Sequence, residues 1–119
     1  MKHLRQENGQ ELIEKVYDLV AKTSIELGHK TDGKTMAALS KILAEDLIRE
    51  KRFGRMTFNQ IEEAFYQGVR FGSFDPFLNI RTFYKWIIAH KKIINDARYQ
   101  TETLGQKNVP FYQEQKLLK

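Results

Sequence analysis

The chain has 119 residues, of which 41% are hydrophobic and 29% charged, and its formal net charge is +5 at pH 7. This length predicts a single domain, and the lack of any run of roughly 18 apolar residues argues against a membrane-spanning helix. With no Cys, the chain offers neither disulfides nor thiolate metal ligands, and its start, MKHLRQENGQ, lacks the apolar core of a secretory signal. We therefore expect a cytoplasmic protein with no membrane partner.

The first part of the chain predicts two amphipathic helices. After Asn8 or Gly9, apolar residues recur at helical spacing, and Gly28 suits the position just beyond a helix because it adopts positive φ without steric cost. A second helix is expected from about residue 35 to 51. The apolar positions are Leu12, Ile13, Val16, Leu19, Val20 and Leu27 in the first helix, and Met36, Leu39, Leu43 and Leu47 in the second, with Ile42 beside them.

The turn between these helices, from Gly28 to Thr35, matches the pattern G-x-x-x-x-G-K-[ST] of phosphate-binding loops. In such loops a buried strand leads into the glycine-rich turn, and a second strand ends in an Asp that holds Mg²⁺. Here an amphipathic helix precedes the turn, and no stretch of the chain has the alternating pattern of a strand. We interpret the match as a helix–helix turn and expect no cofactor.

The segment from Thr57 to Ile94 holds the only Trp and most of the Phe, so we expect the core to be centred there. Thr57 and Gln60 have the spacing of a capping box, which predicts a helix that begins at this point and ends near Gly72. Asn79 is a good N-cap for a second helix. The segment therefore predicts two helices joined by an aromatic loop.

That loop, residues 71–78, contains three aromatic side chains, Phe71, Phe74 and Phe77, which we expect to bury one side of it. A helix-turn-helix motif joins its helices by about 3–4 residues, so this connection is too long for the standard motif. A looser helical arrangement for DNA binding stays open.

On a helical wheel, the last long helix has two different faces. The apolar face carries Phe83, Trp86, Ile87, His90, Ile93 and Ile94. The opposite face carries Arg81, Lys85 and Lys92 nearly in line, with Ile88 between them and Tyr84 at the edge. Cations interleaved with an aromatic side chain are what a nucleic-acid surface requires, although charged faces are also common on solvated helices.

No set of residues indicates catalysis or metal binding. His3, His29 and His90 are scattered, and no pair of them has the spacing of a helical metal site. His90 lies within the apolar face, where we expect a hydrogen-bonded core histidine. Glu62 and Glu63 are neighbours on one helix and point in different directions, so they are not arranged as an acid–base pair. We expect a protein without enzymatic activity and without a metal.

The positive charge is concentrated around the last long helix. Residues Met1–Lys34 carry six basic and six acidic groups, whereas Arg81–Arg98 carries five basic groups and one acidic group. A further group of cations, Lys51, Arg52 and Arg55, precedes the aromatic segment. Such a distribution suits a phosphate backbone, an acidic protein surface or a plain solvated face.

We divide the chain into one helical domain, residues 1–97, and a polar C-terminal tail or arm, residues 98–119. The tail lacks a sustained apolar stripe, but Phe111 and Tyr112 follow Pro110 within it. These two side chains either pack the tail on its own domain or dock it on a partner. The expected fold is an all-α, compact bundle of about four helices with an aromatic-rich loop and a C-terminal tail.

One sequence pattern resembles that of small helical proteins of phages and mobile elements. It reads Ile61-x-x-Ala64-Phe65-x-x-Gly68-Val69-Arg70, followed by Phe77-Leu78-Asn79-x-Arg81-Thr82-Phe83-Tyr84-x-Trp86-Ile87. Some of these proteins are tied to DNA replication in the manner of helicase loaders or replisome organisers. The resemblance covers about a third of the chain. It implies binding to DNA, to a replication protein such as a helicase, or to both, and it carries over no catalytic residue.

Two functional hypotheses follow. The first is a non-catalytic binding module of DNA replication, in which cations replace the counterions of phosphates. Its expected nucleic-acid contacts are Arg81, Lys85, Lys92, Lys51, Arg52 and Arg55. Its expected partner contacts are Tyr84, Ile88, Phe111 and Tyr112. The alternative is a protein-only adaptor or inhibitor that binds an acidic partner surface.

Overall fold

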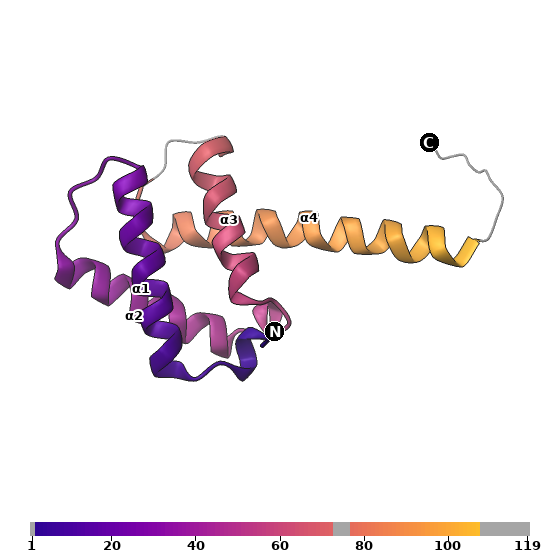
Figure 1. Cartoon of the computed structure of the whole chain (residues 1–119), viewed down its shortest axis with the longest axis horizontal. Helices are drawn as coiled ribbons and strands as arrows, with labels where there is room; N and C mark the ends of the chain where they lie inside the picture. The colour runs from indigo at the N-terminus through magenta and orange to yellow at the C-terminus, as the bar shows by residue number, and fades with distance from the viewer. Residues whose placement is uncertain (1, 73–76, 108–119) are drawn as a thin grey trace.

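The computed structural model describes residues 2–72 and 77–107, with side chains placed up to residue 99. This part of the chain is helical, and its one β-pairing is an isolated bridge between His3 and Thr57. The α-helices are α1 (Gly9–Glu26), α2 (Gly33–Arg49), α3 (Phe58–Phe71) and α4 (Ile80–Lys107), and the 3-10 helices are η1 (Leu4–Gln6) and η2 (Lys51–Phe53). The predicted all-α bundle of about four helices is confirmed (Figure 1).

Local side-chain caps explain where the helices begin. Asn8 accepts hydrogen bonds from two backbone N–H groups in the first turn of α1, at 3.0 and 3.1 Å. Thr57 and Gln60 form the predicted capping box of α3, and Asn79 caps α4 by accepting the Thr82 N–H at 2.8 Å. Each such cap stabilises its helix by about 1 kcal/mol. The predicted starts of α3 and α4 are therefore confirmed.

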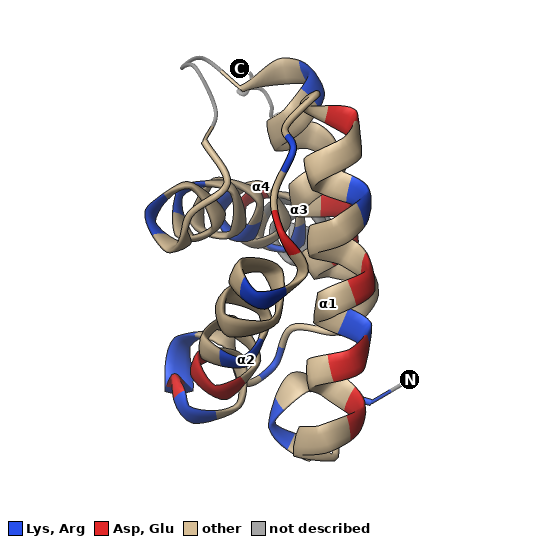
Figure 2. Cartoon of the chain, turned by 90° about the vertical axis from the view of Figure 1, so that its left-hand side faces the viewer, with Lys and Arg blue, Asp and Glu red and all other residues tan. Residues whose placement is uncertain are grey.

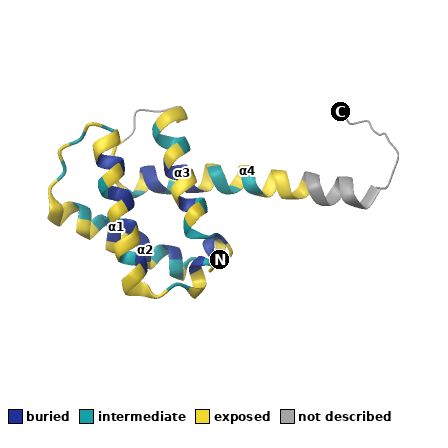
Figure 3. Ribbon diagram, in the orientation of Figure 1, coloured by how far each residue is buried: buried dark blue, intermediate teal, exposed yellow. Residues whose placement is uncertain are grey.

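The core lies where α1 and α2, packed on each other, meet the pair formed by α3 and α4 (Figure 3). An aromatic cluster joins α3 to α4, because the Phe65 ring lies 5.0 Å from that of Phe83 and 5.3 Å from that of Trp86, measured between centroids. Leu12 of α1 and Leu43 of α2 are also fully buried. The core thus includes the predicted aromatic segment but extends across all four α-helices.

Close packing of α3 on α4 depends on a glycine. A methyl group added at Gly68 would overlap the ring of Trp86, whose side chain is only 3% exposed. The absence of a side chain at Gly68 therefore sets the distance between the two helices.

Helix α4 packs on the other helices along its first part and then projects beyond them (Figure 1). Ile87 is fully buried, but Ile93, which belongs to the same predicted apolar face, is 60% exposed and lies outside the core. The reason is that Ile93 borders an open hollow between α4 and α3 instead of the packed contact between these helices. The helix also continues to Lys107, past residue 98 where the sequence analysis began the tail. Phe111 and Tyr112 lie outside the described residues.

The loop between α3 and α4 was expected to bury its Phe side chains. Phe71 and Phe77 are instead 71% and 62% exposed, and Phe74 lies outside the described residues. The contact between α3 and α4 is made by the buried rings of Phe65, Phe83 and Trp86 instead. This expectation was wrong for both Phe side chains that are described.

Within residues 2–72 and 77–107, none of the helices combines the length and the apolarity that crossing a membrane requires.

Candidate functional site

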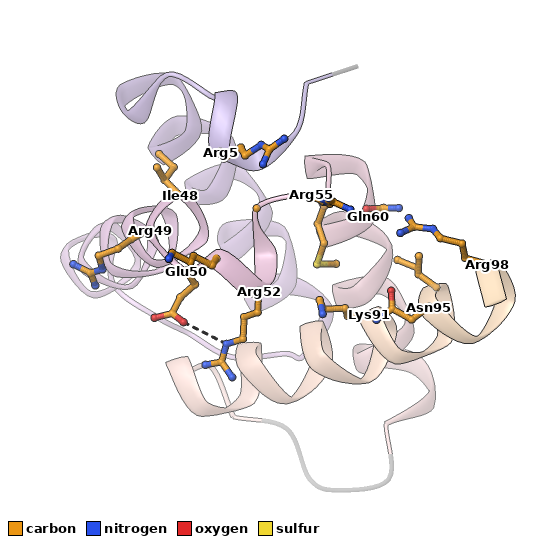
Figure 4. A pocket seen from close by; sticks show the side chains of 14 residues that line it. Arg5, Ile48, Arg49, Glu50, Arg52, Arg55, Gln60, Lys91, Asn95 and Arg98 are labelled. Carbon is orange, nitrogen blue, oxygen red and sulfur yellow. Dashed lines mark ion pairs between the residues drawn. The ribbon is translucent and has the colours of Figure 1, made fainter. Parts of the chain in front are cut away.

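A cleft of about 610 Å³ lies beside α4, facing η2 and the residues that follow it (Figure 4). Its lining contains seven cations and one carboxylate, that of Glu50. The cations are Arg5, Arg49, Lys51, Arg52, Arg55, Lys91 and Arg98. We call this hollow the basic cleft. By contrast, acidic and basic residues are interspersed along α1 (Figure 2).

Segments far apart in sequence build the basic cleft. The N-terminal segment lies against residues 54–56, because the Leu4 N–H donates to the Met56 carbonyl at 2.7 Å and the Arg5 N–H to that of Gly54 at 3.4 Å. This contact brings Arg5 next to η2 and Arg55. Lys91 and Arg98 lie across from them on α4, about two helical turns apart.

Most of these cations are not neutralised. Arg52 Nε lies 3.3 Å from a Glu50 carboxylate oxygen, and Arg49 Nη2 lies 2.8 Å from Asp46 Oδ1. The other five cations of the cleft form no ion pair with any residue in the part of the chain that the structure describes. Like charges this close together create a strongly positive local potential.

The lining of the cleft also includes three apolar side chains, Ile48, Met56 and Ile94, which we call the apolar floor. Met56 is 5% exposed, and the two Ile side chains are half-buried. Asn95 adds an exposed amide at the α4 side (Figure 4). The lining of the basic cleft therefore combines apolar side chains with many positive charges.

Only one of the two predicted basic groups lies in this cleft. Lys51, Arg52 and Arg55 line it together. Arg81, Lys85 and Lys92 are exposed on α4, as expected, but none of them lines the cleft. Lys85 borders a different hollow, and Lys92 Nζ pairs with Asp96 Oδ2 at 3.0 Å.

Four cations of the cleft were not predicted from the sequence as contacts, namely Arg5, Arg49, Lys91 and Arg98. A signal existed for two of them, since Lys91 and Arg98 fall at about 280° and 260° on a wheel that starts at Arg81, beside Tyr84 at about 300°. That column flanks the apolar face, whereas the predicted face lay opposite it. Arg5 had no local signal, because only the pairing of the N-terminal segment brings it to the cleft.

Tyr84 joins α4 to α2. Its hydroxyl donates to Asp46 Oδ2 at 2.7 Å, and its ring meets that of Phe53 edge-on at 5.6 Å. Burial and the hydrogen bond to Asp46 raise the pKa of Tyr84 well above its usual value. The Tyr84 ring is half-buried, so only part of it is accessible at the edge of the basic face. Ile88, by contrast, is 44% exposed.

A second hollow, of about 270 Å³, lies on the other side of α4, against α3. We call it the apolar groove. Its lining includes Gly68, Phe71, Trp86, His90 and Ile93. The Nε1 of Trp86 and the Nδ1 of His90 are buried without a hydrogen-bond partner among the described residues. His90 is thus half-buried at this groove, and its Nδ1 lacks the hydrogen bond expected of a core histidine.

The turn that matches a phosphate-binding loop lies between two helices. Gly28, with φ of 75°, follows α1, and Gly33 is the first residue of α2. The Asp32 carboxylate occupies the start of α2, where it accepts hydrogen bonds from the hydroxyl of Thr35 at 2.6 Å and from its N–H at 3.3 Å. These bonds lower the pKa of Asp32. A negatively charged group already fills the place that a phosphate would take.

Among residues 2–72 and 77–99, whose side chains the structure places, no group of three or more His, Asp or Glu is arranged to hold a metal ion. Comparisons with models of protein families, with curated proteins and with solved structures find no match. The function has to be inferred from the geometry and charge of the site.

Proposed function

We propose that this chain is a non-catalytic module that binds DNA through the basic cleft. The observation that carries the proposal is the meeting of seven cations around one hollow, five of them without an ion pair in the described part of the chain. Binding a phosphate backbone there releases condensed counterions, which favours association and makes it depend on salt. Like-charge repulsion within the cleft falls when phosphates enter.

The other predicted cations have a secondary part in this proposal. Arg81, Lys85 and Lys92 lie on the exposed side of α4, outside the cleft. At that position they extend the positive potential and speed the encounter with DNA, because such attraction acts over about 8 Å at physiological ionic strength. The cleft cations make the closer contacts.

The proposed setting is DNA replication, and the support for it is the resemblance to helical proteins of phages and mobile elements. Gly68, Phe83 and Trp86 of that pattern pack the core, which agrees with a fold signature rather than a catalytic one. In this proposal the module acts by holding DNA, a replication protein such as a helicase, or both.

The test measures binding of labelled DNA across a salt series by fluorescence anisotropy. The variant Lys51→Ala/Arg55→Ala/Lys91→Ala removes three cleft cations, and we expect affinity to fall more than tenfold and the salt slope to decrease by about 2–3. The matched control is Lys22→Ala/Lys30→Ala/Lys41→Ala, which removes the same charge from exposed positions outside the cleft. An equal loss in both variants would mean that net charge alone drives binding, and the cleft would be dropped.

A second candidate is a protein-only adaptor or inhibitor, and the apolar groove favours it. Phe71 and Ile93 are 71% and 60% exposed at this groove, and the Trp86 N–H there has no described acceptor. Exposed apolar surface of this kind marks protein contacts. If the protein binds no DNA at low salt, capture of a partner that depends on Phe71 and Ile93 supports this candidate.

A further inference from the structure

We infer that the basic cleft takes unpaired nucleotides, so that the nucleic acid it binds is a single strand rather than a duplex. This inference rests on the proposed function, but it depends on a different feature of the cleft, namely the apolar floor formed by Ile48, Met56 and Ile94.

The apolar floor favours a single strand over a duplex. A duplex presents phosphates and sugars at its surface and keeps its bases stacked inside, so it meets the cations but gains nothing from apolar surface below them. In a single strand, a base turns away from the backbone and its face packs on whatever apolar or planar group lies next to the phosphates. Ile48 and Ile94 are half-buried and therefore still have surface to cover.

The size of the cleft agrees with this ligand. Its volume of about 610 Å³ lies within the range of about 300–1,000 Å³ in which proteins hold small organic molecules. A base and its sugar are molecules of that class.

Two polar side chains are placed to contact a base. The Arg52 guanidinium lies over the rings of Phe53 and Tyr84, at 5.2 and 5.7 Å from their centroids, and is paired with Glu50. Its side chain is still 52% exposed, so a planar group held in one orientation is available for stacking. The Asn95 amide supplies both a donor and an acceptor to a base edge.

The experiment compares three probes of about 16 nucleotides with the full chain. They are a single strand, its duplex, and an abasic strand that keeps the phosphates and sugars but lacks the bases. We expect the single strand to bind about tenfold more tightly than the other two, because only its bases reach the floor. Equal binding of normal and abasic strands would overturn the inference.

A matched pair of variants locates the effect. Ile94→Ser makes the floor polar, whereas Ile93→Ser changes the neighbouring residue on the groove side of α4. We expect Ile94→Ser to weaken single-strand binding about threefold to tenfold with no change in salt slope, and Ile93→Ser to have no effect. Ile94→Met, which keeps apolar surface, should retain binding. If all three variants bind alike while their melting temperatures show that they are folded, the floor does not contact bases.

Three further outcomes separate this inference from the proposed function. If free AMP displaces the strand at the same concentration of nucleotide, the ligand is a mononucleotide and the inference of a strand is wrong. If the duplex binds as tightly as the single strand and the cleft triple variant weakens both, DNA binding by the cleft stands and only the inference fails. If the triple variant weakens neither, the proposed function itself has failed.

Discussion

Helix α4 has a hollow on each side, and the two differ in chemistry. On one side the basic cleft has seven cations in its lining, and on the other the apolar groove has a single Lys, at position 85. The difference comes from what faces α4. The groove faces Ala64, Gly68 and Gly72, whereas the cleft faces η2 and the N-terminal segment, both rich in Arg and Lys.

Packing of the helices is enough to explain the apolar groove but not the basic cleft. Small residues let α3 approach Trp86, and a shallow groove beside them is a consequence of that packing. Clustered like charges have no such explanation, because they repel one another and lower the stability of the folded state. Sites that lower stability in this way are expected where a protein binds something.

The largest expected effect is on the groove side. Gly68→Ala places a methyl group into the Trp86 ring, and we expect the free energy of unfolding to fall by about 2–3 kcal/mol, the upper part of the range for overpacked cores. Urea unfolding measures this change. The control is Gly33→Ala, where the nearest atom to the added methyl is the Tyr17 hydroxyl at 3.7 Å, and little change is expected. Equal stabilities of the two variants would show that Gly68 is not needed for packing.

A smaller effect is expected where α4 is attached to α2. Tyr84→Phe removes the hydrogen bond to Asp46, and we expect a loss of about 1 kcal/mol at neutral pH. The control Tyr17→Phe removes a hydroxyl that makes no hydrogen bond within the described residues, so its loss should be smaller.

The stability difference between wild type and Tyr84→Phe depends on pH, and its sign follows from the raised pKa of Tyr84. Below about pH 10 the side chain is protonated in both states, and the hydrogen bond contributes fully. Above that pH the unfolded chain loses the proton first, which favours unfolding. The stability difference between wild type and Tyr84→Phe should therefore shrink from about pH 10 upward. A difference that stays constant to pH 11 contradicts the assigned role of the hydroxyl.

Helix starts were predictable because their signals are local. The hydrogen bonds of Thr57 with Gln60, and of Asn79 with the first turn of α4, join residues three apart in sequence. The all-α class of the fold was predictable for a similar reason, because apolar residues recur at helical spacing within each helix. Ile93 shows the limit, since periodicity identifies the face of a helix but not where its neighbours end.

The basic cleft was not predictable in full, because it depends on contacts between distant segments. Arg5 reaches Arg55 through the hydrogen bonds of the N-terminal segment to residues 54–56. The direction of α4 relative to η2 then decides which of its cations face the cleft. The helical wheel indicated a charged side of α4, but only the tertiary arrangement distinguishes Lys91 from Lys92.

These two neighbouring lysines provide the finest test of the comparison. Lys91 is half-buried in the cleft, whereas Lys92, one residue later, lies outside it and pairs with Asp96. Because either Ala substitution removes one positive charge from adjacent positions on the same helix, a difference in DNA binding reports position alone. We expect Lys91→Ala to weaken binding about threefold to fivefold and to lower the salt slope by about 1, and Lys92→Ala to change the affinity less than twofold.

For the free energy of unfolding, we expect Lys92→Ala to cause the larger loss and Lys91→Ala the smaller. Lys91→Ala relieves repulsion among the cleft cations, so its free energy of unfolding should be unchanged or slightly higher. Lys92→Ala breaks an exposed ion pair with Asp96, which costs at most about 0.5 kcal/mol. Anisotropy titrations and urea unfolding on the same preparations measure both quantities. If Lys92→Ala weakens DNA binding as much as Lys91→Ala does, the contact surface is the outer face of α4 with Arg81, Lys85 and Lys92, because a cleft-bound strand leaves that face uncovered.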